Sequence, residues 1–405
     1  MLETAGAIGL SHERDGTSEG STGQLSSKAA SVSDYRALAK ARLPHFLFEY
    51  LDGGSYDEVT LRRNIEDLQA IALRQRVLRD VSAIDLSTQL FGHRWSMPVG
   101  LGPVGLSGLY ARRGEVQAAK AAAAANVPMA LSTVSACSLV EVAASGHVPW
   151  YQLYFVKDRG FVADMIARAD EAGSAALILT VDLAVPGSRY RDSRAAGSGL
   201  KRNLELLARP GWLWDVGIRG RPISLGNLEP IVGKAAPLGD FQRWIHDNFD
   251  ASVTWKDVEW VRARWKGPLI IKGILDPHDA QEASANGADA IVVSNHGGRQ
   301  LDGALSTARA LPRVAQAVGG RLPIMVDGGV RSGLDVVRML ALGAEFVLLG
   351  RAWAYALAAG GQAGVAHALR IINAEMRVAM ALTGCTRVDQ LGVEILDETS
   401  SQATF

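Results

Sequence analysis

The sequence is poor in cysteine, in long apolar runs and in excess charge of either sign, and each shortage excludes a class of protein. Two cysteines, Cys137 and Cys385, in 405 residues cannot build a disulfide scaffold and fit a reducing cytosol. No apolar run reaches the roughly 18 residues of a membrane-spanning helix, and the N-terminus lacks the basic and apolar regions of a signal peptide. The 42 basic residues balance 42 acidic ones, so the basic surplus typical of nucleic-acid-binding proteins is missing.

Apolar residues, by contrast, make up 48% of the chain, which is ample for a large core. A barrel of β/α units takes about 250 residues and passes 400 with insertions, so one elaborated domain fits the length. Residues 1–30 are rich in Ser, Gly, Thr and Glu without apolar periodicity, and we expect a disordered tail there. Residues 31–405 then form one domain, with its barrel from about residue 97 to residue 360.

From residue 97 onward, short apolar runs alternate with helical patterns such as Glu115–Ala125 and Leu334–Leu342. This alternation favours a parallel sheet, and strands that are apolar throughout favour a sheet covered on both faces. Eight such units favour closure, so the predicted fold is an α/β protein with a (β/α)8 TIM barrel. The predicted strands are Met97–Leu101, Met129–Ser132, Trp150–Phe155, Leu177–Asp182, Leu269–Lys272, Ala290–Ser294, Ile324–Asp327 and Phe346–Leu349.

Two segments stand outside this rhythm. Before the barrel, Asp34–Ala41 and Phe46–Leu51 are predicted helices that pack on it. After the fourth strand, roughly 85 residues precede the fifth, and of these only Trp255–Trp265 is predicted to be helical. We expect the rest to be an irregular βα loop on the face where such barrels place their active sites.

The strongest functional motif, Ser294-Asn-His296-Gly-Gly-Arg299-Gln-Leu-Asp302, directly follows the sixth strand. A histidine at a strand end can accept a proton near neutral pH, and an arginine three residues later can hold a carboxylate. The glycines allow the backbone to approach a ligand. The alternative is that His296 is a structural histidine, which its company at a strand end disfavours.

Three other strand ends carry polar side chains that fit the same site. Asp182 ends the fourth strand and can orient a protonated imidazole, or merely cap a helix. Gln152 and Tyr154 end the third strand on one face, so both can meet a ligand. Arg189 follows Asp182 and is either a substrate-binding or a solvated arginine.

Lys272, at the end of the fifth strand, is costly inside an apolar strand unless it faces a negative partner. That partner is either a ligand or a carboxylate on a neighbouring strand. A third possibility is a Schiff-base lysine, as in aldolases.

The loops after strands seven and eight predict a phosphate site, because backbone N–H groups and a helix N-terminus meet there. They carry Asp327-Gly328-Gly329-Val-Arg331 and Gly350-Arg351. The pattern Gly100-Leu-Gly102-Pro-Val-Gly105 matches a dinucleotide fingerprint, but the next strand does not end in the acidic residue that such a fold needs.

These motifs resemble the FMN-dependent L-2-hydroxy acid oxidases and dehydrogenases, and are closest to the bacterial respiratory L-lactate dehydrogenase branch. The resemblance runs from about Asp34 to Gly392 and includes Phe46–Gly54, Tyr110–Lys120, Pro186–Asp192 and Ile271–Pro277. It implies an enzyme that oxidises L-lactate to pyruvate with FMN and passes electrons to a respiratory quinone. A homotetramer is also expected, and no metal.

The resemblance also assigns roles to residues. His296 would be the base and Asp182 its partner, while Tyr50, Tyr154, Arg189 and Arg299 would hold the substrate. Lys272 would stabilise reduced flavin. The ring and ribityl chain would lie against Pro103, Gly105, Ser132, Gln152, Thr180 and Ser294, and the ribityl and phosphate groups against Asp327, Gly328, Gly329, Arg331, Gly350 and Arg351.

Gly105 and Val134 stand where glycolate oxidase has Ala and Trp, and mandelate dehydrogenase shares the glycine. This smaller lining leaves room for a larger acid such as (S)-mandelate. By the same analogy, glycine favours a dehydrogenase over an oxidase.

The long loop is basic and rich in tryptophan, with Lys201, Arg202, Arg209, Arg219 and Arg221 beside Trp212, Trp214 and Trp244. Such a surface fits a membrane interface, so we expect peripheral attachment to the cytoplasmic side of the inner membrane. The alternative is a soluble cytoplasmic protein whose loop packs its tryptophans inward. Two other classes of protein are alternatives to a hydroxy acid dehydrogenase. One is a flavin-dependent barrel isomerase, which should lack a paired-arginine clamp, and the other is a non-catalytic barrel that binds flavin or phosphate.

Overall fold

The barrel is built from a single sheet of parallel strands. The computed structural model describes residues 27–195, 199–220, 224–229, 244 and 247–397. The strands of this sheet are β3 (Val99–Leu101), β4 (Ala130–Ser132), β5 (Trp150–Leu153), β6 (Leu177–Thr180), β7 (Leu269–Ile274), β8 (Ala290–Val293), β9 (Ile324–Val326) and β10 (Phe346–Leu349). They form an 8-stranded sheet in the order β3-β10-β9-β8-β7-β6-β5-β4. A parallel bridge between Leu101 and Met129 joins the end strands β3 and β4, so the predicted (β/α)8 barrel is confirmed.

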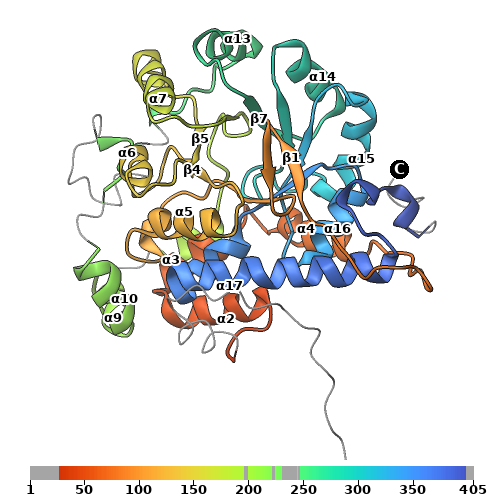
Figure 1. Cartoon of the computed structure of the whole chain (residues 1–405). Coiled ribbons are helices and arrows are strands. Elements are labelled where there is room, and N and C mark those ends of the chain that lie inside the picture. Colours follow the sequence, from red (N-terminus) through yellow and green to blue (C-terminus); the bar gives the residue numbers. More distant parts are fainter. Residues whose placement is uncertain (1–26, 196–198, 221–223, 230–243, 245–246, 398–405) are drawn as a thin grey trace, which may run out of the picture.

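Between successive strands, and after the last one, lies a helix that covers the outside of the barrel (Figure 1), and further helices precede the one between β6 and β7. In chain order these are α5 (Gly114–Ala124), α6 (Leu139–Ala143), α7 (Arg159–Glu171), α13 (Trp255–Arg264), α14 (Pro277–Ala285), α15 (Thr307–Val318), α16 (Gly333–Ala341) and α17 (Arg351–Thr383). Side chains that accept from the first turn begin several of them, such as Asp158 before α7 and Ser332 before α16. The helix α17 is broken at Gly361, whose φ of 58° and ψ of −143° are not helical.

The strands divide their side chains between two apolar clusters. Leu177 and Leu179 of β6 pack in the large cluster between sheet and helices, whereas Ile178 belongs to the small cluster inside the barrel. This alternation is the period of two of a strand buried on both faces. The residue two places after Ile178 is Thr180, so the same period turns polar side chains inward at the C-terminal end.

A hairpin closes the N-terminal end of the barrel. Strands β1 (Thr88–Leu90) and β2 (His93–Trp95) pair antiparallel. Leu90 joins the interior cluster, and the rings of Phe91 and Trp95 lie 6.0 and 6.2 Å from that of Trp150. Because this end is filled by side chains, ligands reach the barrel from the other end.

In the described part of the chain before the barrel lie α2 (Val32–Arg42), α3 (His45–Asp52) and α4 (Val59–Gln69). The two helices predicted here are confirmed, since α2 and α3 bracket the break at Pro44. In α2, Ser31 and Asp34 form a capping box. The helix α2 packs along α17 (Figure 1), and α3 brings Tyr50 to the open end of the barrel.

The long segment after β6 corrects one expectation. It was expected to be irregular, but it contains α8 (Tyr190–Ala195), α9 (Gly199–Leu207), α10 (Pro210–Trp212) and the π-helix η2 (Leu213–Ile218). The amphipathic repeat of Leu204 and Leu207 supports a short helix that the glycines and prolines around it obscure. The predicted tail at residues 1–30 lies almost wholly outside the described residues.

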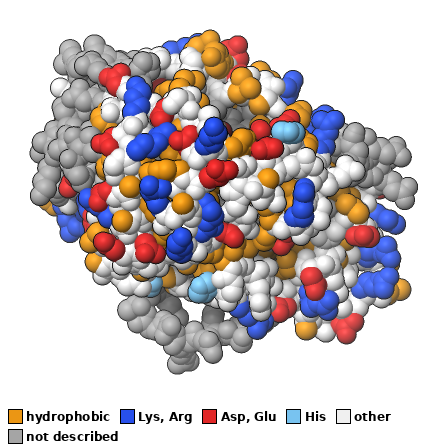
Figure 2. Space-filling view, turned by 90° about the horizontal axis from the view of Figure 1, so that it is seen from above, with side chains coloured by type: hydrophobic (Ala, Val, Ile, Leu, Met, Phe, Trp, Pro, Cys, Tyr) orange, Lys and Arg blue, Asp and Glu red, His pale blue; other side chains and the backbone are white. Residues whose placement is uncertain are grey.

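The remaining short elements are the 3-10 helices η1 (Ser107–Leu109), η3 (Val388–Gln390) and η4 (Val393–Ile395). Cys137 and Cys385 are both buried and unpaired. Among the described residues, no helix combines the length and apolar character needed to cross a membrane. The face shown in Figure 2 carries Lys and Arg side chains interspersed with Asp and Glu, in keeping with the balanced charge.

Candidate active site

Polar side chains form the floor of a pocket at the open end of the barrel. Ser132 donates a hydrogen bond of 3.0 Å to Gln152 Oε1, and Gln152 Nε2 donates one of 3.0 Å to Thr180 Oγ1. All three are buried and each is two residues beyond an inward apolar residue of its strand. This chain of hydrogen bonds fixes the orientation of the Gln152 amide and of the Thr180 hydroxyl at the pocket floor.

On the other side of the floor, Lys272 forms an ion pair with a neighbouring strand end. Its Nζ lies 3.0 Å from Asp327 Oδ2 and donates to Ser294 Oγ at 2.9 Å. Burial lowers the pKa of Lys272, but the carboxylates of Asp327 and Asp182 outweigh it and hold the pKa above its usual value. A cation is therefore fixed at the floor, and the carboxylate partner considered from sequence is Asp327.

His296 and Asp182 form the pair expected of a base and its orienting carboxylate. The distance from His296 Nδ1 to Asp182 Oδ1 is 2.9 Å. Burial raises the pKa of Asp182, but the adjacent His296 and then Lys272 bring it below its usual value, so the carboxylate is charged. A carboxylate accepts a hydrogen bond from Nδ1, so neutral His296 keeps a lone pair on Nε2.

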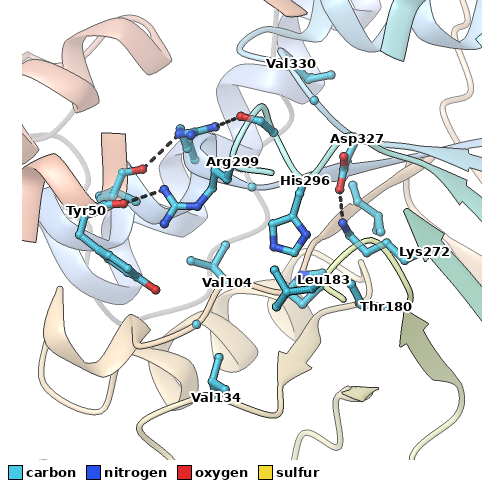
Figure 3. Close-up of a pocket in the computed structure, with 18 of the residues that line it drawn as sticks. Tyr50, Val104, Val134, Thr180, Leu183, Lys272, His296, Arg299, Asp327 and Val330 are labelled. Carbon is cyan, nitrogen blue, oxygen red and sulfur yellow. Dashed lines mark hydrogen bonds and ion pairs between the residues drawn. The ribbon is translucent and has the colours of Figure 1, made fainter. Parts of the chain in front are cut away.

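The backbone of His296 is unusual as well. Its φ of 57° lies in the left-handed region, which is uncommon for any residue other than glycine. Gly297 and Gly298 continue the left-handed turn with φ of 64° and 74°. This turn holds the imidazole over the floor, where it lines the pocket beside Lys272 (Figure 3).

Two arginines and a tyrosine line the side of the pocket nearest α3. Arg299 donates to the carbonyls of Tyr50 and Gly53 at 2.7 and 2.9 Å, and its guanidinium carbon lies 4.9 Å from the centre of the Tyr50 ring. The guanidinium of Arg189 lies 5.7 Å from the same ring. Its Nε is buried without a hydrogen-bond partner among the described residues. Burial and the charge of Arg299 lower the pKa of Arg189, so an anion between the two arginines would be stabilised.

The loops after β9 and β10, which the sequence predicts to bind phosphate, meet at the N-terminus of α17. Arg351 donates to the carbonyls of Leu51, Gly297 and Gly53 at 3.1, 2.9 and 2.7 Å. Burial, reinforced by the charges of Arg299 and Arg331, lowers the pKa of Arg351 to about 9. This crowding of positive charge at a helix N-terminus fits a bound phosphate, which would relieve it.

Aromatic and apolar side chains complete the walls. The ring of Tyr154 stacks on His296 at 6.5 Å and contacts Phe249 at 5.2 Å. Burial raises the pKa of Tyr154, so its phenol keeps its proton and can donate. A Cβ built on Gly105 would lie 2.8 Å from Val134 Cγ2, so a larger residue is excluded there unless Val134 moves.

Most of the predicted site residues line this one pocket. They are Tyr50, Pro103, Gly105, Tyr154, Thr180, Arg189, Lys272, His296, Arg299, Asp327, Gly328, Gly329, Arg331, Gly350 and Arg351. The structure places Asp182 behind His296, and Ser132, Gln152 and Ser294 beneath the lining. Sequence reasoning assigned no role to Tyr110, Leu183 or Phe249, which also line the pocket. Leu183 could have been found, since it directly follows the end of the predicted fourth strand.

Comparison with known proteins identifies the chain. Residues 39–398 match the FMN-dependent dehydrogenase family. The chain belongs to this family. It is 58% identical over 375 residues to an L-lactate dehydrogenase of Caulobacter sp. (strain K31), which covers 91% of this chain and 99% of that relative. It is also 58% identical over 379 residues to an L-lactate dehydrogenase of Xanthomonas campestris pv. campestris (strain B100), covering 92% and 98%.

Solved structures of family members share the fold. One described as the monotopic membrane protein (S)-mandelate dehydrogenase has a TM-score of 0.86 and 36% identity, covering 91% of this chain and 99% of that one. A mandelate oxidase has a TM-score of 0.76 and 37% identity, covering 90% and 97%. Together with the family match, these similarities show that this chain is an FMN-dependent dehydrogenase.

The residues present fit FMN. Asp327 lines the pocket, and its buried Oδ1 has no hydrogen-bond partner in the described part of the chain, so it is free to accept from a hydroxyl of the ribityl chain. Gly328 and Gly329, with φ of 96° and 80°, leave the backbone open beside Arg331 and Arg351. When bound, the cofactor would supply the redox chemistry, Arg331 and Arg351 would hold its phosphate, and Lys272 would face its ring from the floor.

Proposed function

We propose that this FMN-dependent dehydrogenase oxidises L-lactate to pyruvate. The observation that carries the proposal is the His296–Asp182 pair beside Arg189 and Arg299, within one pocket whose far end fits a phosphate. Two L-lactate dehydrogenases that are 58% identical to this chain support the choice of acid. A barrel isomerase would have no need of the paired arginines.

In this proposal the chain binds the substrate carboxylate between Arg189 and Arg299, with the phenol of Tyr50 and Tyr154 available to the carboxylate and hydroxyl oxygens. Nε2 of His296 accepts the hydroxyl proton as the Cα–H bond breaks, and the charge of Asp182 stabilises the imidazolium that forms. FMN, when bound, would supply the acceptor for the Cα hydrogen together with the two electrons of its bond. In the alternative order, His296 removes the proton from Cα first.

Gly105 and Val134 lie together in the lining of the pocket. The resemblance implies room for a larger acid there, because glycolate oxidase carries Ala and Trp at these positions. Val134 Cγ2 lies 2.8 Å from the point where a Cβ of residue 105 would be, so the valine already takes part of that room. (S)-mandelate stays the second candidate because mandelate dehydrogenase is a 36% identical neighbour.

Anaerobic reduction of the bound flavin tests the proposal. Purified yellow enzyme is mixed without oxygen with L-lactate, glycolate or (S)-mandelate, and bleaching near 450 nm is followed. We expect the highest rate per concentration with L-lactate. Bleaching by mandelate alone would move the assignment to the second candidate, and no bleaching by any 2-hydroxy acid would refute the proposed activity.

We propose further that the enzyme attaches to the cytoplasmic side of the inner membrane and delivers electrons to a quinone. The support is the α9–η2 segment, which projects from the side of the barrel (Figure 1). Its side chains Leu204, Leu207, Trp214 and Ile218 are more than half exposed, at 60, 67, 58 and 53%. Such an apolar edge fits the headgroup boundary of a bilayer.

One tryptophan of the loop fits the membrane interpretation, and two fit the alternative of a loop that packs its tryptophans inward. Trp212 is buried and donates from Nε1 to the carbonyl of Leu109 at 2.8 Å, and Trp244 packs near Phe249. Only Trp214 points outward. Lys201, Arg202 and Arg221 have no described side chains, and Arg219 is exposed.

Removing two exposed apolar side chains tests the membrane proposal. We expect the double variant Trp214→Ser with Ile218→Ser to bind phosphatidylcholine–phosphatidylglycerol vesicles at least about tenfold more weakly. Each substitution removes apolar area that the bilayer would otherwise bury. The matched control changes Val378 and Leu382 to Ser, two exposed residues of α17. Equal binding by all three proteins in vesicle flotation would contradict the proposal. A homotetramer, also proposed, is tested by light scattering on the same samples.

A further inference from the structure

A cluster of charged side chains lies outside the pocket, between α3 and the segment after β6. It consists of Glu49, Asp52, Glu58, Arg36 and Arg191, and we refer to it as the Arg191 cluster. Arg191 contacts Glu49 through Nε, Asp52 Oδ2 at 2.9 Å and Glu58 Oε1 at 3.3 Å. Arg36 donates to both oxygens of Asp52 at 2.6 and 2.8 Å. One guanidinium, that of Arg191, thus joins three carboxylates.

The Arg191 cluster is held together by burial and by hydrogen bonds. Asp52 is buried, and the hydroxyl of Tyr355 from α17 donates to its Oδ1 at 2.6 Å. Burial would raise the pKa of Asp52, but the hydrogen bonds from Arg36 and Tyr355 hold it well below its usual value. The side chain of Arg191 is itself only 23% exposed. These are not solvated surface pairs, whose contribution is small.

Arg191 stands two residues from Arg189, and its carboxylate partners flank Tyr50. Glu49 and Asp52 belong to α3 with Tyr50, while Arg189 lies just before α8. The cluster therefore joins the two segments that face each other across the substrate side of the pocket, where the Arg189 guanidinium is 5.7 Å from the Tyr50 ring. A backbone hydrogen bond from Tyr56 N–H to the Ser188 carbonyl at 2.8 Å repeats this link nearby.

The C-terminus of α3 also accepts hydrogen bonds from Arg299, the second arginine of the pocket. The carbonyls of Tyr50 and Gly53, which flank Asp52, accept the hydrogen bonds of Arg299. Loss of Arg191 would leave Glu49, Asp52 and Glu58 with Arg36 as their main cationic partner. Their repulsion would displace the end of α3 and leave surplus negative charge close to an anion site.

We propose that Arg191 is a positioning residue for the substrate carboxylate: by joining Glu49, Asp52 and Glu58 it sets the spacing of Arg189 from Tyr50 and Arg299. The inference rests on the proposed oxidation of a 2-hydroxy acid. Arg191 does not line the pocket and touches no reacting atom. Its effect is on binding of the carboxylate, not on the His296–Asp182 pair or on the FMN phosphate site.

The test compares Arg191→Met with Arg194→Met, an exposed arginine one turn later on the same helix. We expect Arg191→Met to raise KM for L-lactate about tenfold or more, with kcat and FMN content close to those of the wild type. The Kd of oxalate, a carboxylate ligand without an oxidisable carbon–hydrogen bond, should rise by a similar factor. Arg194→Met should change neither constant.

Arg191→Lys supplies the conservative comparison, because lysine keeps the charge but cannot reach three carboxylates at once. Its KM should lie between those of the wild type and Arg191→Met, and it replaces the methionine variant if that protein does not fold. Unchanged KM and oxalate Kd in a folded variant would overturn the inference. A fall in kcat or FMN content at constant KM would do the same. Failure of the wild type to react with any 2-hydroxy acid would instead refute the proposed function.

Discussion

Replacing His296 with alanine is expected to abolish flavin reduction by L-lactate while FMN stays bound. The imidazole is the proposed proton acceptor, and loss of a positioned general base costs between about 10² and 10⁴ in rate. FMN should remain because its predicted anchors, such as Lys272, Arg331 and Arg351, come from other strand ends. The measurement is stopped-flow anaerobic reduction, with flavin absorbance reporting cofactor content.

His296→Asn is the matched control for the backbone. The φ of 57° at this position is better tolerated by asparagine than by alanine, so the asparagine variant separates loss of the base from distortion of the turn. Both variants should be inactive to a similar degree. Near-normal reduction in either would exclude His296 as the base, and loss of FMN in alanine alone would assign the residue a role in shaping the turn.

Much of this site was predictable because strand periodicity carries it. The apolar runs predicted all the barrel strands to within two residues of their bounds, and the period of two explains why Thr180, Lys272 and Asp327 lie on the inner face. A barrel gathers its strand ends at one mouth. Residues more than a hundred positions apart, such as Asp182 and His296, could therefore be assigned to one site before any geometry was known.

The remainder depends on contacts that have no local signature. Phe249 reaches the pocket from the end of the long insertion, where neither periodicity nor a strand end marks it. The partner of Lys272 could not be chosen from sequence, since a ligand and a neighbouring carboxylate satisfy the same cost of burial. The share of the room at Gly105 that Val134 takes up could not be predicted either, because the position of Val134 Cγ2 depends on the packing of two loops.

The ion pair of Lys272 leads to the second large effect. Lys272→Met is expected to slow flavin reduction about 10²-fold, as when a preorganised charge stabiliser is removed. It should also destabilise the fold by about 3 kcal/mol, because Asp327 would be left without its cation in a partly buried site. The measurements are the anaerobic reduction rate and the free energy of unfolding from denaturant titration.

The double variant Lys272→Met with Asp327→Asn separates these two effects. Removing both partners of a buried pair is often close to neutral, so the stability of the double variant should lie close to that of the wild type and above that of either single variant. The reduction rate should stay about 10²-fold below that of Asp327→Asn, because no cation then faces the negative charge that the flavin ring gains on reduction. Recovery of stability together with the rate would mean that Lys272 serves only to balance Asp327.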